Sequence, residues 1–137
     1  MHRCDLHCHS THSDGTLTPE ELVQLARKLG LRTLALTDHD AISGVSQAIE
    51  AGRREGVRVL SGVEISVEYA NKTVHMLGYC FDEGVDSLAH KLDELVRGRN
   101  ERNVKIVRRL NELGLKVTLK EIEAEAGGKV VGRPHIA

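Results

Sequence analysis

An apolar run over residues 31–37 is the feature that most limits how this chain can fold. It lies between two stretches with helical periodicity, one from Thr18 to Gly30 and the other over residues 44–54. A compact run of this kind is typical of a strand buried on both faces. Another strand region is expected over residues 57–65, interrupted at residues 61–62. The alternating order of strands and helices predicts an α/β fold with a parallel sheet.

The first strand is expected over residues 3–8, just before a polar loop. Successive side chains of a strand point to opposite faces, so His7 and His9 point one way and Cys8 points towards an apolar layer. Two neighbouring imidazoles form half of a metal site, and Asp14 follows after a short turn. Imidazole and carboxylate together suit zinc, manganese or iron. The alternative is a few surface histidines, but their spacing matches the strand period.

Two further residues with metal-binding side chains follow the next two strands. His39 comes just past the second strand, and Glu64 lies near the end of the third. The carboxyl ends of parallel strands meet at one edge of a sheet, where active residues gather. We therefore expect these two residues to meet His7 and His9 in one site.

The segment over residues 66–79 predicts a β-hairpin whose turn is at residues 70–72. With the turn centred between Ala70 and Asn71, Ser66 faces His75, and His75 lies on the same face of the sheet as Glu64. A shift of one residue would turn His75 to the opposite face. Its alternative role is that of a lone strand histidine with a structural hydrogen bond.

The flanking polar residues allow more than one role. Asp38 and Asp40 are expected either to orient His39 and its neighbours by hydrogen bonds or to mark the entry to the next helix, with Asp40 as N-cap. His12 shares the loop with Asp14, but its spacing does not match the strand period. We see no Ser-His-Asp set and no phosphate-cradling glycine loop, which disfavours covalent catalysis.

The pattern changes at Asp86, where long helical periodicity begins. This helical stretch is expected to end at Gly114 and to be followed by a short helix over residues 119–126. A basic stretch over residues 97–103 interrupts the apolar positions. We interpret it as a solvated helix face or a joint between two helices. The alternative is a cover that supplies an arginine to a phosphate.

The composition excludes several classes of protein. A chain of 137 residues with 40% hydrophobic and 28% charged residues is typical of one soluble domain. A net charge of −1 and only 2% aromatic residues argue against a nucleic-acid surface built on charge and base stacking. Three cysteines are an odd count, which fits a reducing compartment. We find no signal-peptide or membrane-spanning run, so we expect a cytoplasmic location and no membrane partner.

Four short motifs occur in a fixed order along the chain. They are His7-x-His9 with Asp14, Thr37-Asp38-His39-Asp40, Gly62-Val63-Glu64-Ile65-Ser66, and His75-Met76-Leu77-Gly78-Tyr79. Together they resemble the PHP family, the polymerase and histidinol phosphatase domain. The resemblance implies part of a distorted (βα)7 barrel interrupted by a helical insertion. Residues 1–85 would form the N-terminal part of the barrel, which carries the metal ligands, and residues 86–137 would form the insertion.

The resemblance also implies two or three divalent ions, manganese, iron or zinc, at the rim of the barrel. The implied metal ligands are His7, His9, Asp14, His39, Glu64 and His75. Asp14, His39 and His135 would take part in catalysis, and Glu64 would bridge two ions. Arg133 and His135 would contact the phosphate of the substrate.

The branch of the family that the chain resembles consists of small phosphoesterases acting on nucleotides and RNA 5′ ends. The expected reaction is hydrolysis of 3′,5′-bisphosphate nucleotides or short RNA 5′ ends by a metal-bound hydroxide. Alternatives are a histidinol-phosphate-type phosphatase, amidohydrolase chemistry, or a non-catalytic metal-binding domain. The expected partners are a small phosphate ester or a short oligonucleotide, with no stable protein partner.

One departure from the family pattern concerns length. The family's remaining ligands, another histidine and a late Asp-x-His, would lie beyond position 137. The resemblance therefore covers about the first half of the family domain. We expect this part by itself to have open sheet edges and incomplete activity.

Overall fold

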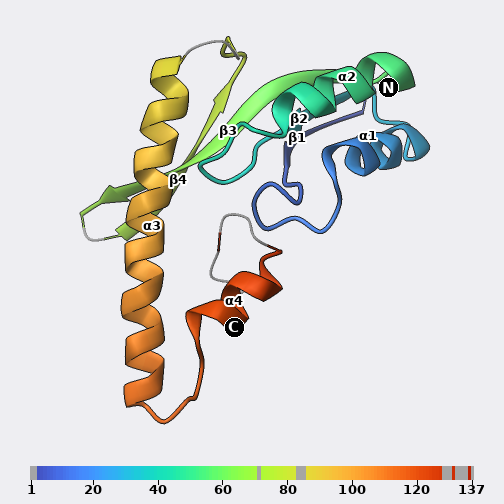
Figure 1. The fold of residues 1–137 in the computed structure, drawn as a ribbon. Coiled ribbons are helices and arrows are strands. Elements are labelled where there is room, and N and C mark those ends of the chain that lie inside the picture. The colour runs from blue at the N-terminus through green and yellow to red at the C-terminus, as the bar shows by residue number, and fades with distance from the viewer. Residues whose placement is uncertain (1–2, 71, 83–85, 128–130, 132–135, 137) are drawn as a thin grey trace.

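The computed structural model describes residues 3–70, 72–82, 86–127, 131 and 136 (Figure 1). The elements in chain order are β1 (Cys4–Cys8), α1 (Pro19–Lys28), β2 (Thr33–Leu36), α2 (Val45–Glu55), β3 (Arg58–Tyr69), β4 (Lys72–Tyr79), α3 (Asp86–Glu112) and α4 (Leu119–Glu125). Arg133 and His135, predicted to contact phosphate, lie outside the described residues.

The strands form one curled sheet in the order β1-β2-β3-β4 (Figure 1). β1, β2 and β3 are parallel, whereas β4 returns antiparallel to β3. This confirms the predicted α/β fold, the parallel sheet and the hairpin. Ser66 pairs with His75, as the predicted register requires. Past the end of β2, an isolated bridge between His39 and Glu64 continues the contact with β3.

The two crossover helices begin and end as local chemistry dictates. The Thr18 side chain accepts a hydrogen bond from the Glu21 backbone, and the Glu21 carboxylate accepts one from the Thr18 backbone, which completes the predicted capping box of α1. The N-cap of α2 is Gly44, and Gly56 ends that helix in a left-handed conformation. The prediction that Asp40 caps α2 is therefore wrong.

The hydrophobic core lies between α1, α2 and the sheet. Its buried residues are Val23, Ala26, Leu34, Leu36, Ala48, Ala51 and Val57. Cys8 packs against this cluster, as the strand period predicts. Burial, reinforced by the charge of Asp5, raises the pKa of the Cys8 thiol to about 12. The thiol is therefore protonated at neutral pH and behaves as a small apolar side chain.

The helical part differs from its prediction at the basic stretch. α3 is one continuous helix, so there is no joint at residues 97–103. Arg99 and Asn103 are buried, so this face of the helix is not simply solvated. The Asn103 side-chain amide donates a hydrogen bond to the Val131 carbonyl oxygen at 3.1 Å. Among the described residues, no helix has the length and apolar character required to cross a membrane.

Gly62 is a position where β3 passes close to β2. A Cβ atom there would lie 2.6 Å from the Leu36 carbonyl oxygen and 2.7 Å from the Thr37 Cγ2. Gly62→Ala should therefore lower the free energy of unfolding by about 1–3 kcal/mol. Gly98→Ala is the matched control, because a Cβ atom there meets no atom within 4 Å. Alanine within a helix should raise the free energy of unfolding by up to about 1 kcal/mol.

Urea denaturation followed by circular dichroism gives both free energies of unfolding. An Ala variant at position 62 that is as stable as the original protein would show that the two strands have room to separate.

Candidate metal centre

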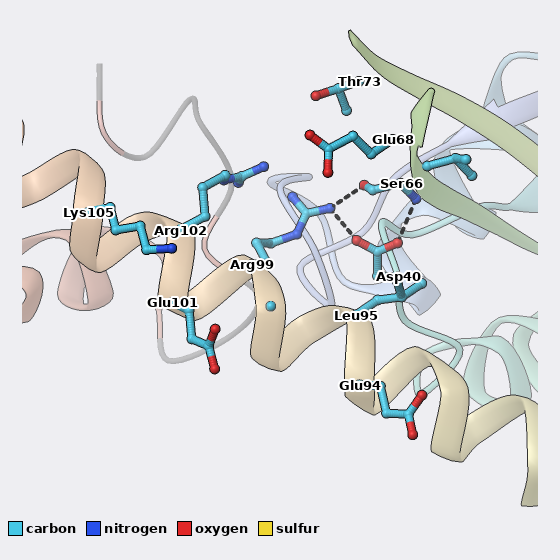
Figure 2. A pocket seen from close by; sticks show the side chains of 12 residues that line it. Asp40, Ser66, Glu68, Thr73, Glu94, Leu95, Arg99, Glu101, Arg102 and Lys105 are labelled. Carbon is cyan, nitrogen blue, oxygen red and sulfur yellow. Dashed lines mark hydrogen bonds and ion pairs between the residues drawn. The ribbon is translucent and has the colours of Figure 1, made fainter. Parts of the chain in front are cut away.

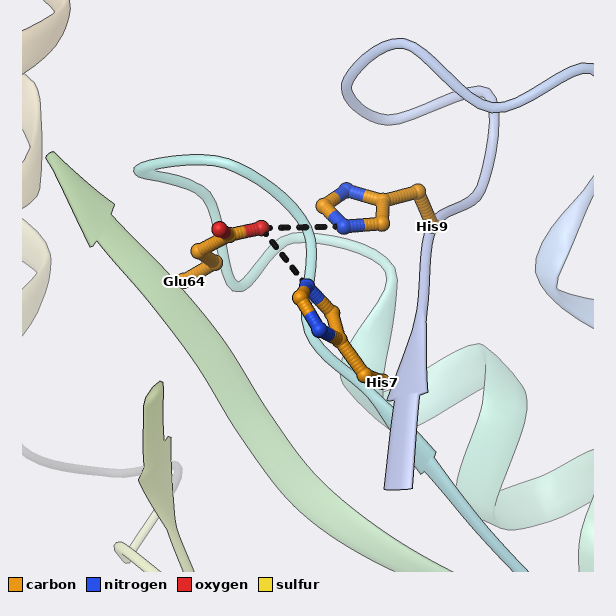
Figure 3. Close-up of side chains that lie close together, drawn as sticks. All are labelled: His7, His9 and Glu64. Carbon is orange, nitrogen blue, oxygen red and sulfur yellow. Dashed lines mark hydrogen bonds and ion pairs between the residues drawn. The ribbon is translucent and has the colours of Figure 1, made fainter. Parts of the chain in front are cut away.

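Four imidazoles surround the carboxylate of Glu64, which is 5% exposed. Its Oε2 atom lies 2.9 Å from the Nε2 atom of His7 and 3.0 Å from the Nε2 atom of His9. Dashed lines in Figure 3 mark these two contacts. The Nδ1 atom of His39 lies 3.4 Å from the same oxygen. On the other side, the Nδ1 atom of His75 lies 2.7 Å from Oε1. These residues come from β1, β3, β4 and the loops that follow β1 and β2.

A second carboxylate, that of Asp14, lies beside two of these rings. Its Oδ1 atom is 3.3 Å from the Nδ1 atom of His9, and its Oδ2 atom is 3.6 Å from the Nε2 atom of His39. The rings of His9 and His39 are 4.6 Å apart between centroids. Both rings therefore lie between Asp14 and Glu64. The structure brings the six predicted ligand residues into one cluster.

The cluster contains three overlapping sets of potential ligands, each with ligand atoms within 4.8 Å of one another. The sets are His7, His9 and Glu64; His9, Asp14 and His39; and His39, Glu64 and His75. Atoms bound about 2.1 Å from one ion can be up to about 4.2 Å apart. Small side-chain shifts would thus let each set hold a divalent ion.

The chemistry of the donors tests whether a metal fits this place. Oε2 of Glu64 faces three ring nitrogens, although one carboxylate oxygen has two lone pairs. The Nδ1 atom of His39 is buried and has no hydrogen-bond partner among the described residues. A cation between these atoms would bind the oxygen and the ring nitrogens together. The residues present therefore fit divalent ions.

The burial and neighbours of two ligands favour their metal-binding forms. Burial, the largest effect, lowers the pKa of His39 and outweighs the opposing charges of Asp14 and Glu64. Burial raises the pKa of the Glu64 carboxyl, but the hydrogen bond with His7 and the charge of His39 outweigh it, so the net pKa is lowered. At neutral pH His39 is therefore a neutral imidazole and Glu64 a carboxylate, which are the forms that ligate metals.

Asp38 organises the loop that carries the first ligands. Its buried carboxylate accepts hydrogen bonds from the backbone and hydroxyl of Ser10, both at 2.7 Å, and from the hydroxyl of Ser13 at 2.6 Å. The Ser13 hydroxyl oxygen also lies 3.3 Å from the Nδ1 atom of His9. Asp38 thus holds the loop beside His9, in line with the orienting role considered from the sequence, and it does not mark a helix entry, because α2 begins at Val45. Sequence reasoning missed both serines, because no periodic pattern marks them.

Asp40 connects the loop after β2 to β3. Its backbone N–H donates to the Glu64 carbonyl oxygen at 2.9 Å, and its Oδ1 atom accepts from the Ser66 backbone at 2.7 Å. Its other oxygen pairs with Arg99 of α3. Asp40 thus acts on the residues next to the ligands, in line with the orienting role considered from the sequence.

Two other histidines in the part of the chain that the structure describes, His12 and His90, lie outside these ligand sets. The Nδ1 atom of His12 lies 2.7 Å from the Ser43 hydroxyl, and His12 belongs to none of the three sets. His90 is exposed on α3.

A family model and several known proteins are similar in sequence to this chain. The family model described as PHP domain matches residues 5–125. A 5'-3' exoribonuclease from Haemophilus influenzae is 38% identical over 133 residues, covering 97% of this chain and 48% of the relative. A 3',5'-nucleoside bisphosphate phosphatase from Chromobacterium violaceum is 43% identical over 102 residues, covering 74% of this chain and 36% of the relative.

A solved structure shows the same fold. A candidate metal-dependent phosphoesterase from Bifidobacterium adolescentis matches with a TM-score of 0.86 and 36% sequence identity. The match covers 97% of this chain and 47% of that protein. The chain therefore spans about half, or less, of the length of these relatives.

Glu64→Gln should weaken Mn²⁺ binding by about 100-fold or more, since the neutral amide has one oxygen in place of two charged ones. Isothermal titration calorimetry measures this affinity. Glu68→Gln on the same strand is the matched control, because Glu68 is exposed and outside the ligand sets. Equal Mn²⁺ affinity in the two variants would contradict the assignment of Glu64 as a ligand.

Mn²⁺ affinity should also fall as the solution is acidified from about pH 7 to about pH 5, where ordinary imidazoles take up a proton. A protonated ring nitrogen cannot ligate, so protons compete with the metal. Because burial lowers the pKa of His39, this ligand should keep its metal-binding form to a lower pH than an ordinary imidazole does. Calorimetric titrations at several pH values measure the affinity, and NMR of the metal-free protein follows the protonation of the His39 side chain. An affinity independent of pH would exclude imidazole ligands.

Proposed function

This chain belongs to the PHP domain family, and we propose that it supplies metal ligands of a phosphoesterase that acts on nucleotides. The substrates proposed are 3′,5′-bisphosphate nucleotides or the 5′ ends of short RNA, in line with the relatives from Chromobacterium violaceum and Haemophilus influenzae. The observation that carries the proposal is the convergence of four imidazoles and two carboxylates on one edge of the sheet.

We assign two or three divalent ions, manganese, iron or zinc, to this cluster. Each ligand set shares residues with the other two, so neighbouring ions would have common ligands, with Glu64 as the bridge between two of them. Divalent ions bound there would lower the pKa of a coordinated water and neutralise the developing charge of the phosphoryl oxygens.

The chain's own residues provide what this chemistry requires. Neutral imidazoles ligate without cancelling the positive charge of the ions, which leaves that charge available to attract a phosphate. Asp14 is the more exposed carboxylate, with 18% side-chain exposure against 7% for Glu64. It is therefore placed to accept a proton from an attacking water, while His39 beside it keeps its orientation.

Two further assignments remain predictions on residues outside the described part of the chain. Arg133 would hold a phosphate through its planar guanidinium group, and His135 would contact the same phosphate or protonate the leaving oxygen. We also propose residues 1–85 as the N-terminal part of a distorted (βα)7 barrel and residues 86–137 as its helical insertion. The change from alternating strands and helices to α3 and α4 supports this division.

The direct test is phosphate release from a 3′,5′-bisphosphate nucleotide by the full-length protein. Activity should be lost with a chelator and return with Mn²⁺. Asp14→Asn should lower kcat by about 100-fold or more, a larger effect than is usual for residues outside the ligand shell. Asp93→Asn, an exposed acid on α3, is the control and should keep full activity.

The substrate panel separates the alternatives. Faster turnover of histidinol phosphate would favour a histidinol-phosphate-type phosphatase, and turnover of amides would favour amidohydrolase chemistry. Metal binding without turnover of any of these substrates would leave a non-catalytic metal-binding domain.

A further inference from the structure

α3 buries polar as well as apolar side chains. Within residues 87–112, Leu92, Arg99 and Asn103 are the buried residues, and two of these three are polar. A groove of about 520 Å³ separates the helix from the β3–β4 hairpin, and Arg99 crosses it (Figure 2). Arg99 therefore links α3 to the loop after β2 and to β3 by a buried polar contact.

Arg99 reaches two residues that flank the metal ligands. Its Nη2 atom donates to the Asp40 carboxylate and to the Ser66 hydroxyl oxygen, the latter at 2.7 Å (Figure 2). Asp40 follows His39 directly, and its other carboxylate oxygen accepts from the Ser66 backbone. Its N–H donates to the Glu64 carbonyl oxygen. One guanidinium thus joins the loop after β2 to the part of β3 that carries Glu64.

The backbone of Asp40 needs this support. Its φ angle is +51°, in the left-handed region that residues other than glycine rarely adopt. Such conformations persist where surrounding contacts over-determine them, and they occur preferentially at functional sites. The carboxylate is 1% exposed, so loss of Arg99 would leave a buried negative charge without its cation. The loop, including His39, would then rearrange.

We propose that Arg99 is a positioning residue of the metal centre, which sets the spacing of His39 and Glu64 through Asp40 and Ser66. This inference rests on the proposed metal-dependent function. It adds that metal binding and the docking of α3 are energetically coupled. Coupling of this kind is reciprocal, so bound metal should in turn hold α3 more firmly.

The first test measures Mn²⁺ affinity of the full-length protein by electron paramagnetic resonance. Arg99→Met should bind Mn²⁺ about 10- to 100-fold more weakly, the usual cost of losing a residue that supports metal ligands. Arg99→Lys keeps the charge and should recover part of the affinity. Arg108→Met is the matched control, an exposed arginine on the same helix, and should bind like the original protein. Unchanged affinity in a folded Arg99→Met variant would overturn the inference.

The second test needs no variant and therefore does not depend on Arg99→Met folding. Hydrogen exchange of the α3 amides near Arg99 should slow when Mn²⁺ binds to the original protein. If Mn²⁺ binds but the exchange rate of these amides does not change, the coupling is overturned and the proposed function remains intact. Failure of the original protein to bind Mn²⁺ at all would instead overturn the proposed function, and the inference with it.

Discussion

A buried carboxylate surrounded by imidazoles is the constraint on which the rest of the structure depends. Removing the charge of Glu64 from water is costly unless other groups compensate for it. The rings of His7, His9 and His75 lie within 3.0 Å of its oxygens and supply part of that compensation. Such an arrangement has little value for stability alone, because apolar packing would achieve the same burial more simply. It becomes understandable when cations occupy the space between the carboxylates and the rings.

Buried acids next to the candidate ligands also need polar partners. β2 is a buried strand, yet the chain that leaves it remains buried through Thr37, Asp38 and Asp40. Asp38 accepts hydrogen bonds from the loop after β1, and Asp40 binds both β3 and α3. Buried polar networks that are well paired are rigid. The three candidate ligands that lie on loops, His9, Asp14 and His39, are therefore held in fixed positions.

The family relationship and the geometry contribute different parts of the functional argument. The similarity to phosphatases and exoribonucleases supports the proposed class of substrate. A net charge of −1 gives the chain no general attraction for phosphate, so the attraction has to come from the site itself. Divalent ions in the cluster would concentrate positive charge locally, and neutral imidazole ligands would leave that charge uncancelled. Arg99, although basic, is already paired with Asp40.

Local periodicity alone determined much of the site. The strand period placed His7 and His9 together, the order of strands and helices brought His39 and Glu64 to the same edge, and the hairpin turn placed His75. These relations follow from the geometry of a strand, a strand–helix–strand unit and a turn, so they can be predicted from the sequence. The tertiary structure alone decided the partners of Asp38 and Arg99. Arg99 and Asp40 are 59 residues apart, and no pattern in either segment shows that a long side chain on a helix will reach a turn of the sheet.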